Sequence, residues 1–393
     1  MALSRRQFVQ TVGIGAGAAL TSSVWGRGRE HSVWSAFEPE LQAVERGVIC
    51  IASNENPVGP GQKVLDSLRK VLEGGTRPGR YSNQMGDLTE AIAGHFKVKT
   101  ENILLGEGST EILRAATQVF TSKTKALVGT IPTYEECAGY AELIGNPVKG
   151  VKLNSELKID LDAMLAAAKG AGLVFYCNPN NPTATYVGAK ATRDFLTKLI
   201  AASPDTTVLV DEAYFDYVTD ADHETHAMFA LEHPQVIVAR TFSKAYGMAG
   251  LRQGYAIAHP DTLKKLRQWT AAGGSGSLNV FGMNAATVAI GQDASFTANE
   301  RKRNAAVRDF TMKWFADRGM KPTDCQANFM FVNIGTPAKA FREACRAKGV
   351  MVARDFPPFH QTHARISLGT MEEMQKAVQV FGDVLGKKST AAA

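Results

Sequence analysis

Cysteine is scarce in this sequence. The five that occur are widely spaced, and none forms a Cys-x-x-Cys pair: Cys50, Cys137, Cys177, Cys325 and Cys345. An odd number of scattered cysteines gives no disulfide framework and no thiolate zinc site. Two close histidine pairs, in "HETH" and "HQTH", lack the HExxH pattern and an accompanying carboxylate cluster. We therefore expect no metal site.

Excess positive charge is absent from most of the chain. The formal net charge is +6, but Arg5, Arg6, Arg27 and Arg29 all precede the first acidic residue, Glu30. Without these four charges, +6 falls to +2. So small a charge does not make a surface for polyanions, and we expect no nucleic-acid partner.

A long apolar run is also missing. The N-terminal apolar stretch is short and rich in glycine, which argues against a transmembrane helix and against stable membrane association. Its basic start is typical of an export signal, and "SRRQF" resembles the twin-arginine motif of bacterial proteins exported in the folded state. We predict a signal peptide over residues 1–29, export through the twin-arginine machinery and a periplasmic location. A membrane anchor or a frayed helix is the alternative.

Short strand-like runs alternate with amphipathic helical runs from about residue 100, for example "GLVFYCN", "ATRDFLTKLIAAS" and "TTVLVDEAY". This alternation predicts an α/β fold with a large, doubly wound, mainly parallel sheet. The stretch "AAGGSGS" is predicted to be a flexible connection to a smaller α/β domain built from both chain ends. The expected boundaries are residues 30–75 for the N-terminal part of the small domain, 76–275 for the large domain and 276–393 for the C-terminal small domain.

A polar turn in "LLGEGSTEIL" lies between a predicted strand and a helix start. Gly108, Ser109 and Thr110 would offer a phosphate backbone N–H groups, two hydroxyls and the positive end of the helix dipole. Helix capping alone also explains these residue types. The next strand end carries Tyr134, whose ring could stack on a flat ligand or simply be half-buried.

Two further predicted strands end at Asn181 and Asp211. Asn181 could present its amide to a ligand, although turn formation explains most stretches like "YCNPNNPTAT". Asp211 follows three apolar residues in "VLVDEAYFDY", and a carboxylate at that depth needs a cationic or hydrogen-bonding partner. A helix N-cap is the alternative for Asp211. Tyr214 is close enough in the sequence to share its ligand.

Lys244 lies in "TFSKAYGMAGLR", directly after the predicted strand "VIVARTF". Its side chain should therefore enter the same strand-end cleft as Asp211. Loss of hydration lowers the pKa of a lysine, and the neutral amine can attack a carbonyl carbon. Thr241, Ser243 and Arg252 could hold an anion beside it.

An anion site, a stacking ring, a buried carboxylate and a reactive lysine on successive strands together predict pyridoxal phosphate as cofactor. These residues, with "ASNENPVGP", "RYSNQMGDLTEAIA", "PTYEE" and "ARISLGT", resemble the class I/II aminotransferases of pyridoxal-phosphate fold type I. Within that family the sequence is similar to the histidinol-phosphate aminotransferase group. The resemblance extends over about residues 46 to 385.

The resemblance implies a role for each polar strand-end residue. Lys244 would form the Schiff base and move the substrate proton, and Asp211 would keep the pyridine nitrogen protonated. Tyr214 and Asn181 would hydrogen-bond the phenolic oxygen of the cofactor, and Tyr134 would stack on its ring. The residues implied to surround the phosphate are Gly108, Ser109, Thr110, Thr241, Ser243 and Arg252.

A homodimer with shared active sites is also implied, because Tyr81 would reach the phosphate in the partner subunit. Arg365 would bind the α-carboxylate of the substrate, helped by Asn181. Arg354 in "VARDF" is a candidate for binding an anionic substrate side chain, and a solvated arginine at a strand end is the alternative. The implied reaction is ping-pong transfer of an amino group between an amino acid and a 2-oxo acid.

Several positions depart from the family pattern. Ala184 stands where the family usually has glycine, Thr110 where aspartate is common, and Val58 where a tyrosine commonly faces the distal end of the substrate. Export also conflicts with histidine biosynthesis, which is cytosolic, so the substrate is left open. The alternatives are β-elimination or decarboxylation on the same framework, or a non-catalytic protein of this fold that binds an amino acid.

Overall fold

A computed structural model describes residues 47–74, 79–81, 85–274, 277–292 and 295–386. The predicted signal peptide lies outside these residues. The described residues belong to one compact unit, which begins at Val44. No helix in the described ranges is long and apolar enough to cross a membrane.

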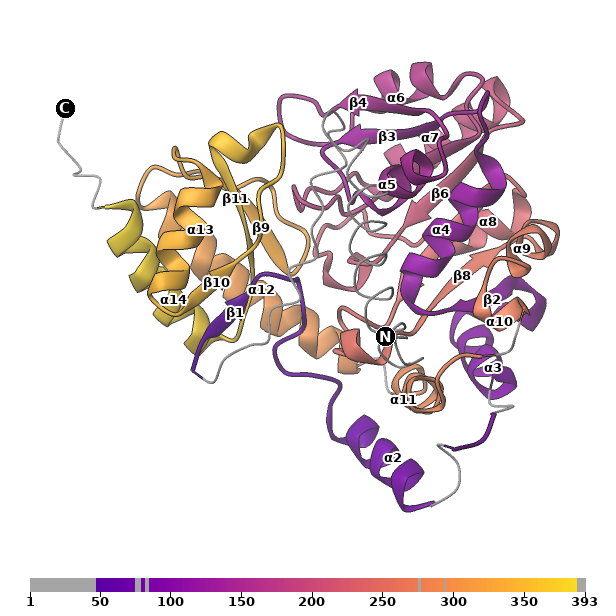
Figure 1. Cartoon of the computed structure of the whole chain (residues 1–393), viewed down its shortest axis with the longest axis horizontal. Coiled ribbons are helices and arrows are strands. Elements are labelled where there is room, and N and C mark those ends of the chain that lie inside the picture. Colours follow the sequence, from indigo (N-terminus) through magenta and orange to yellow (C-terminus); the bar gives the residue numbers. More distant parts are fainter. Residues whose placement is uncertain (1–46, 75–78, 82–84, 275–276, 293–294, 387–393) are drawn as a thin grey trace, which may run out of the picture. The chain divides into compact units, whose positions relative to one another are not determined.

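A seven-stranded sheet forms the larger part of the fold (Figure 1). Its spatial order is β2-β8-β7-β6-β5-β3-β4, and strands β7, β6, β5, β3 and β4 are parallel to one another. Strand β8 is antiparallel to both of its neighbours, β2 and β7. The strands are β2 (Ile103–Gly106), β3 (Leu127–Ile131), β4 (Val148–Lys152), β5 (Leu173–Cys177), β6 (Thr207–Asp211), β7 (Val236–Thr241) and β8 (Gly254–Ala258).

Helices cover both faces of this sheet because its central strands are apolar on both sides. Val208 and Val210 on β6 belong to one core cluster with residues of α6, α7 and α8, while Leu209 between them points to the opposite face, where α4 contacts the sheet. The helices that follow the strands are α4 (Gly108–Phe120), α5 (Glu136–Leu143), α6 (Leu161–Ala168), α7 (Ala189–Ala202), α8 (Ala227–Glu232) and α9 (Pro260–Arg267).

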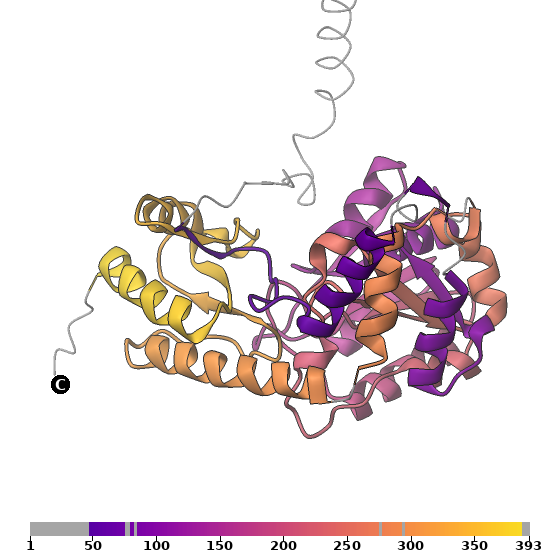
Figure 2. The same ribbon diagram turned by 90° about the horizontal axis from the view of Figure 1, so that it is seen from below.

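The chain end and the first described strand build a second, smaller layer. Figure 1 shows β1 (Ile49–Ile51) beside β10 (Val350–Val352), with which it pairs in parallel, while β9 (Phe329–Asn333) and β11 (His363–Ser367) form an antiparallel pair. The helices α12 (Ser295–Ala316) and α14 (Met371–Leu385) lie side by side along this part in Figure 2, and α13 (Ala338–Ala347) packs on α14. A core cluster centred on Phe329, Phe341 and Phe381 fills the space between them.

Three helices join the large sheet from outside its βα alternation. Helix α2 (Gln62–Glu73) contacts α11 (Val280–Ile290), which also contacts α3 (Met85–Phe96). All three contribute to a core cluster that includes strands β2 and β8. The domain boundaries expected at residues 75 and 275 stay predictions.

The flexible connection expected in "AAGGSGS" is wrong for its first four residues, which form the short helix α10 (Ala271–Gly274). The Glu111 carboxylate accepts a hydrogen bond from the backbone N–H of Ala271 (2.8 Å) and so caps the start of this helix. A carboxylate distant in the sequence supplies the cap, which is why local composition did not predict it.

Candidate active site

The carboxyl ends of adjacent parallel strands bring the predicted polar residues to one edge of the sheet. Asp211 is the last residue of β6, and Lys244 follows the end of the neighbouring β7 by three residues. Asn181 lies in the loop after β5, on the other side of β6. Ligands of such sheets bind beyond this edge.

The Asp211 carboxyl group is buried without a cation. Its side chain accepts hydrogen bonds from the backbone N–H of Ala213 (3.1 Å) and from the Cys177 thiol (4.0 Å). Among the described residues, no lysine or arginine lies within ion-pair distance of it. Burial raises the pKa of Asp211 to about 7, although the charge of Lys244 acts in the opposite direction. A carboxylate this deep fits an N–H⁺ group of a ligand.

Lys244 shows the reverse shift. Burial is the main cause that lowers its pKa to about 8, and the positive charges of Arg365 and Arg252 lower it further. Its Nζ donates to the Ser53 carbonyl oxygen (3.3 Å) and lies 5.6 Å from the centroid of the Tyr214 ring. An appreciable fraction of this amine is therefore neutral near pH 8, as a nucleophile requires.

Tyr214 is fixed from two sides. Its ring packs edge-on against Phe329, with centroids 4.9 Å apart, and its hydroxyl oxygen accepts a hydrogen bond from the Asn54 side-chain amide (3.1 Å). Because the oxygen accepts from Asn54, its own proton is available to a ligand oxygen. Burial raises the pKa of Tyr214, which keeps the hydroxyl protonated.

The predicted anion site forms where the loop after β7 approaches the start of α4. The Thr241 hydroxyl donates to Ser243 Oγ (3.0 Å), and Arg252 Nη1 lies 3.4 Å from the same oxygen. Arg252 is exposed and has no carboxylate partner within ion-pair distance in the described part of the chain. Gly108 begins α4 with φ at +67°, and a Cβ atom there would lie 2.5 Å from Arg252 Nη2. This close approach leaves a cradle of backbone N–H groups, hydroxyls and one guanidinium, which fits a phosphate.

Gly108→Ala is expected to weaken cofactor binding by displacing Arg252. The matched control is Gly170→Ala, because Gly170 has φ +72° but no atom within 4 Å of an added Cβ. Both variants should lose about 1 kcal/mol of stability from the left-handed backbone, but only Gly108→Ala should raise the dissociation constant for pyridoxal phosphate, by about tenfold or more. Thermal unfolding measures the loss of stability, and cofactor titration measures the dissociation constant. Equal cofactor affinities in the two variants would contradict a phosphate site at Gly108 and Arg252.

Arg365 on β11 is held next to the loop after β5. Its Nη1 donates to Asn181 Oδ1 (2.8 Å) and its Nη2 to the Ala52 carbonyl oxygen (2.5 Å), while its buried Nε has no hydrogen-bond partner. Burial lowers the pKa of Arg365 to about 10, and no carboxylate of the described residues pairs with it. A buried guanidinium held by neutral groups needs an anion from a ligand.

The remaining predicted residues differ in where they lie. Tyr134 is next to this site, where burial raises its pKa and Thr110 acts in the opposite direction. Arg354 is not a solvated arginine, because it forms an ion pair with Glu135 and its side chain is only 22% exposed. Tyr81 lies apart, with 97% of its surface exposed.

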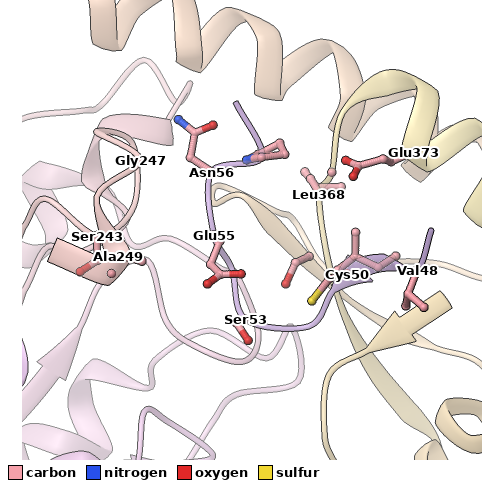
Figure 3. A pocket seen from close by; sticks show the side chains of 15 residues that line it. Val48, Cys50, Ser53, Glu55, Asn56, Ser243, Gly247, Ala249, Leu368 and Glu373 are labelled. Carbon is pink, nitrogen blue, oxygen red and sulfur yellow. The ribbon is translucent and has the colours of Figure 1, made fainter. Parts of the chain in front are cut away.

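The segment 52–54 contacts Arg365, Lys244 and Tyr214. The first two donate to its backbone carbonyl oxygens, and Tyr214 accepts from the Asn54 side chain. Sequence reasoning missed this role. Asn54 also exchanges hydrogen bonds with Ser367, which holds the segment against β11. The segment continues along a cavity of about 330 Å³, where Figure 3 shows Ser53 and Glu55 between the loop at Ser243 and the residues near Leu368. Its only sequence signal was the motif "ASNENP", to which no contact could be assigned.

The histidines of "HETH" are engaged elsewhere. His223 and His226 each contact a backbone carbonyl oxygen, of Phe215 (3.0 Å) and Ala189 (3.3 Å). Within the described ranges, no group of three or more His, Cys, Asp or Glu residues is placed to hold a metal ion.

Comparison with known proteins identifies the family. The family model of the class I and II aminotransferases matches residues 46–381. Histidinol-phosphate aminotransferase from Moorella thermoacetica is 32% identical over 345 residues, 86% of each chain, and histidinol-phosphate aminotransferase 2 from Methylococcus capsulatus is 33% identical over 349 residues, 86% of this chain and 90% of the relative.

Solved structures agree in fold. A candidate histidinol-phosphate aminotransferase from Erwinia carotovora atroseptica superposes with a TM-score of 0.78 at 31% identity, over 86% of this chain and 95% of the other. The Sinorhizobium meliloti histidinol-phosphate aminotransferase, solved with pyridoxal-5'-phosphate, gives 0.80 at 24% identity, over 92% and 99%. The fold is therefore pyridoxal-phosphate fold type I, as predicted.

The residues at the strand ends fit this cofactor: a phosphate cradle at Gly108 and Arg252, a buried acid at Asp211, and an amine of lowered pKa at Lys244. The chain belongs to the class I and II aminotransferases, and it is a pyridoxal-phosphate-dependent aminotransferase.

Proposed function

We propose that this aminotransferase binds an α-amino acid and a 2-oxo acid in turn at one site and exchanges their amino group by a ping-pong mechanism. The observation that carries the substrate class is Arg365, a buried guanidinium with an unpartnered Nε and no carboxylate partner among the described residues. The α-carboxylate that both substrates share would complete it. Asn181, which already accepts from Arg365, would keep its own NH₂ group for a ligand oxygen.

Cofactor binding would use the strand-end residues described above. Pyridoxal phosphate supplies an electron sink that stabilises negative charge at the substrate Cα. Asp211 would hold a proton on the ring nitrogen, Tyr214 and Asn181 would donate to the phenolic oxygen, and Tyr134 would stack on the ring. The phosphate would be held by Ser109, Thr110, Thr241, Ser243 and Arg252, with the N–H groups at Gly108.

Lys244 would attach the cofactor covalently through Nζ and, once displaced by the substrate amine, take the Cα proton and return it. The lowered pKa supports both tasks, because Nζ must lose a proton easily to attack and to act as a base near neutral pH. Its hydrogen bond to the Ser53 carbonyl oxygen orients the amine.

Arg365→Lys is the test of the carboxylate site. Lysine keeps the charge but not the two parallel N–H groups, so KM should rise by about 10²-fold for both the amino donor and the 2-oxo acceptor, with a smaller change in kcat. The control is Arg318→Lys, since Arg318 lies over the Trp314 ring, outside the site. An unchanged KM for both substrates would refute the proposed role of Arg365.

The side chain of the substrate is a separate question. The relatives named above act on histidinol phosphate according to their names, but Val58 here is exposed at 55% and offers no hydroxyl to a distal phosphate. We leave the amino donor open. A homodimer with shared sites is part of the proposal, and the 97% exposure of Tyr81 supports a contact outside its own subunit.

We also propose export of the folded enzyme to the periplasm by the twin-arginine route, on the basis of "SRRQF" and the acid-free start of the chain. Replacing both Arg5 and Arg6 with lysine should leave the protein in the cytoplasm, because the machinery recognises the arginine pair and not charge alone. Cell fractionation measures this, with Arg27→Lys as the control. Export of the double variant at the wild-type level would refute the route.

A further inference from the structure

The ion pair between Glu135 and Arg354 lies beside the carboxylate site. Glu135 directly follows Tyr134 after β3, and Arg354 follows β10 in the smaller layer. Their side chains are 15% and 22% exposed, and Arg354 Nη2 donates to Glu135 Oε1. The second Nη of Arg354 donates to the Asp355 carbonyl oxygen (2.8 Å). Arg354 is thus neutralised and held in place by this chain.

Arg354 and Arg365 share one aromatic platform. The guanidinium carbons of Arg354 and Arg365 lie 4.4 Å and 4.8 Å from the centroid of the Phe356 ring. The charge of Arg354 lowers the pKa of Arg365, and the negative charge of Glu135 raises it. The three charged groups therefore act on one another, and a substrate bound at Arg365 enters their field.

From this arrangement we infer that Glu135 is a specificity-determining residue that selects amino acids with one carboxylate over those with a second anionic group. The inference rests on the proposed function, in which Arg365 binds the α-carboxylate. A distal carboxylate or phosphate would have to share Arg354 with Glu135, and two anions on one half-buried guanidinium repel each other. A neutral, hydrogen-bonding side chain leaves the ion pair intact. Glu135 therefore occupies Arg354, which would otherwise attract a dianionic substrate.

Glu135→Gln tests this because glutamine keeps the shape and the oxygen acceptor but removes the charge. In the cofactor-loaded enzyme, we expect maleate, an unreactive dicarboxylate, to bind about tenfold more tightly than in the wild type. Binding of propionate, an unreactive monocarboxylate, should change by less than about twofold. Isothermal titration calorimetry measures both without any turnover. The ratio of kcat/KM for 2-oxoglutarate to that for pyruvate should rise by the same factor.

Glu136→Gln is the matched control, since the neighbouring carboxylate pairs with Arg114 instead. It should leave the ratio of maleate to propionate affinity unchanged. Adding Arg354→Gln to Glu135→Gln should abolish the gain, because the freed guanidinium is then absent. If Glu135→Gln is recovered unfolded, Glu135→Asp, which retains the charge on a shorter side chain, should give a smaller gain of the same sign.

An unchanged or weakened affinity of Glu135→Gln for maleate would overturn the role of Glu135. Failure of the proposed function has a different signature, because Arg365→Lys would then leave propionate binding unchanged. If Arg365→Lys weakens propionate binding while Glu135→Gln leaves maleate binding unchanged, the carboxylate site stands and only the selectivity role is lost.

Discussion

Replacing Lys244 with alanine is expected to lower the rate of amino transfer by about 10⁴-fold or more, because the variant would lack both the proposed nucleophile and the proposed base. No other lysine is described within hydrogen-bond distance of the Ser53 carbonyl oxygen, where Nζ lies. The measurement is single-turnover conversion of the loaded enzyme with an amino donor, followed by absorbance.

The absorbance of the bound cofactor gives an independent readout of the same variant. Lys244→Ala should bind pyridoxal phosphate without the spectral change that accompanies covalent attachment. Lys198→Ala, which removes an exposed lysine, serves as the control and should match the wild type in rate and spectrum. A wild-type spectrum in Lys244→Ala before substrate is added would rule out the assignment.

Asp211→Asn is the second variant with a large effect, and it acts in opposite directions on activity and stability. Asparagine cannot balance a positive charge on the cofactor ring, so the rate of amino transfer should fall by about 10²- to 10³-fold. The backbone hydrogen bond from Ala213 can be kept by the amide oxygen, so the fold should be preserved. Pre-steady-state kinetics of the half-reaction measure the loss.

In the cofactor-free protein, Asp211→Asn should increase stability relative to the wild type as the pH rises. Burial raises the pKa of Asp211 from 3.8 to about 7, so the folded protein holds a proton that the unfolded chain has already released. The wild type therefore loses stability as the pH rises from about 4 to about 7, and this loss persists above pH 7. Asparagine does not titrate. The free energy of unfolding of Asp211→Asn minus that of the wild type should therefore increase by up to about 4 kcal/mol between pH 4 and pH 7.

Urea unfolding midpoints at pH 5 and pH 8 check this sign. The difference between Asp211→Asn and the wild type should be larger at pH 8. Asp205→Asn, at an exposed site, is the control and should show no such dependence. A variant that is equally destabilised at both pH values would contradict the buried, uncompensated carboxyl group.

Residues at the ends of strands could be predicted from the sequence because apolar runs followed by a polar residue fix where a parallel strand leaves the core. Asp211 and Lys244 are of this kind, and the structure brings them within electrostatic reach of each other. Contacts between segments far apart in the sequence could not be predicted in this way. The pairing of Arg354 with Glu135 and of Asn54 with Tyr214 joins residues 219 and 160 positions apart.

Ala184 stands where the family usually has glycine. The structure places this alanine at φ +59°, fully buried, with its N–H bonded to the Asn180 carbonyl oxygen (2.7 Å). The turn thus retains the left-handed conformation that suits glycine and bears a cost of about 1 kcal/mol.

The pairing of β1 with β10 also sets the order in which the site can be assembled during synthesis. Residues 49–51 pair with residues 350–352, and Gly247 packs so closely against Gly59 that a Cβ atom there would lie 2.2 Å from the Gly59 carbonyl carbon. At about 5 to 20 residues per second, the first segment leaves the ribosome roughly 15 to 60 s before its partner strand exists. Asn54, whose backbone N–H donates to Ser367 Oγ (2.9 Å), therefore makes this contact only late in translation. A chain that has not yet reached residue 367 lacks these contacts, so a fully formed site marks a chain whose synthesis has passed this residue.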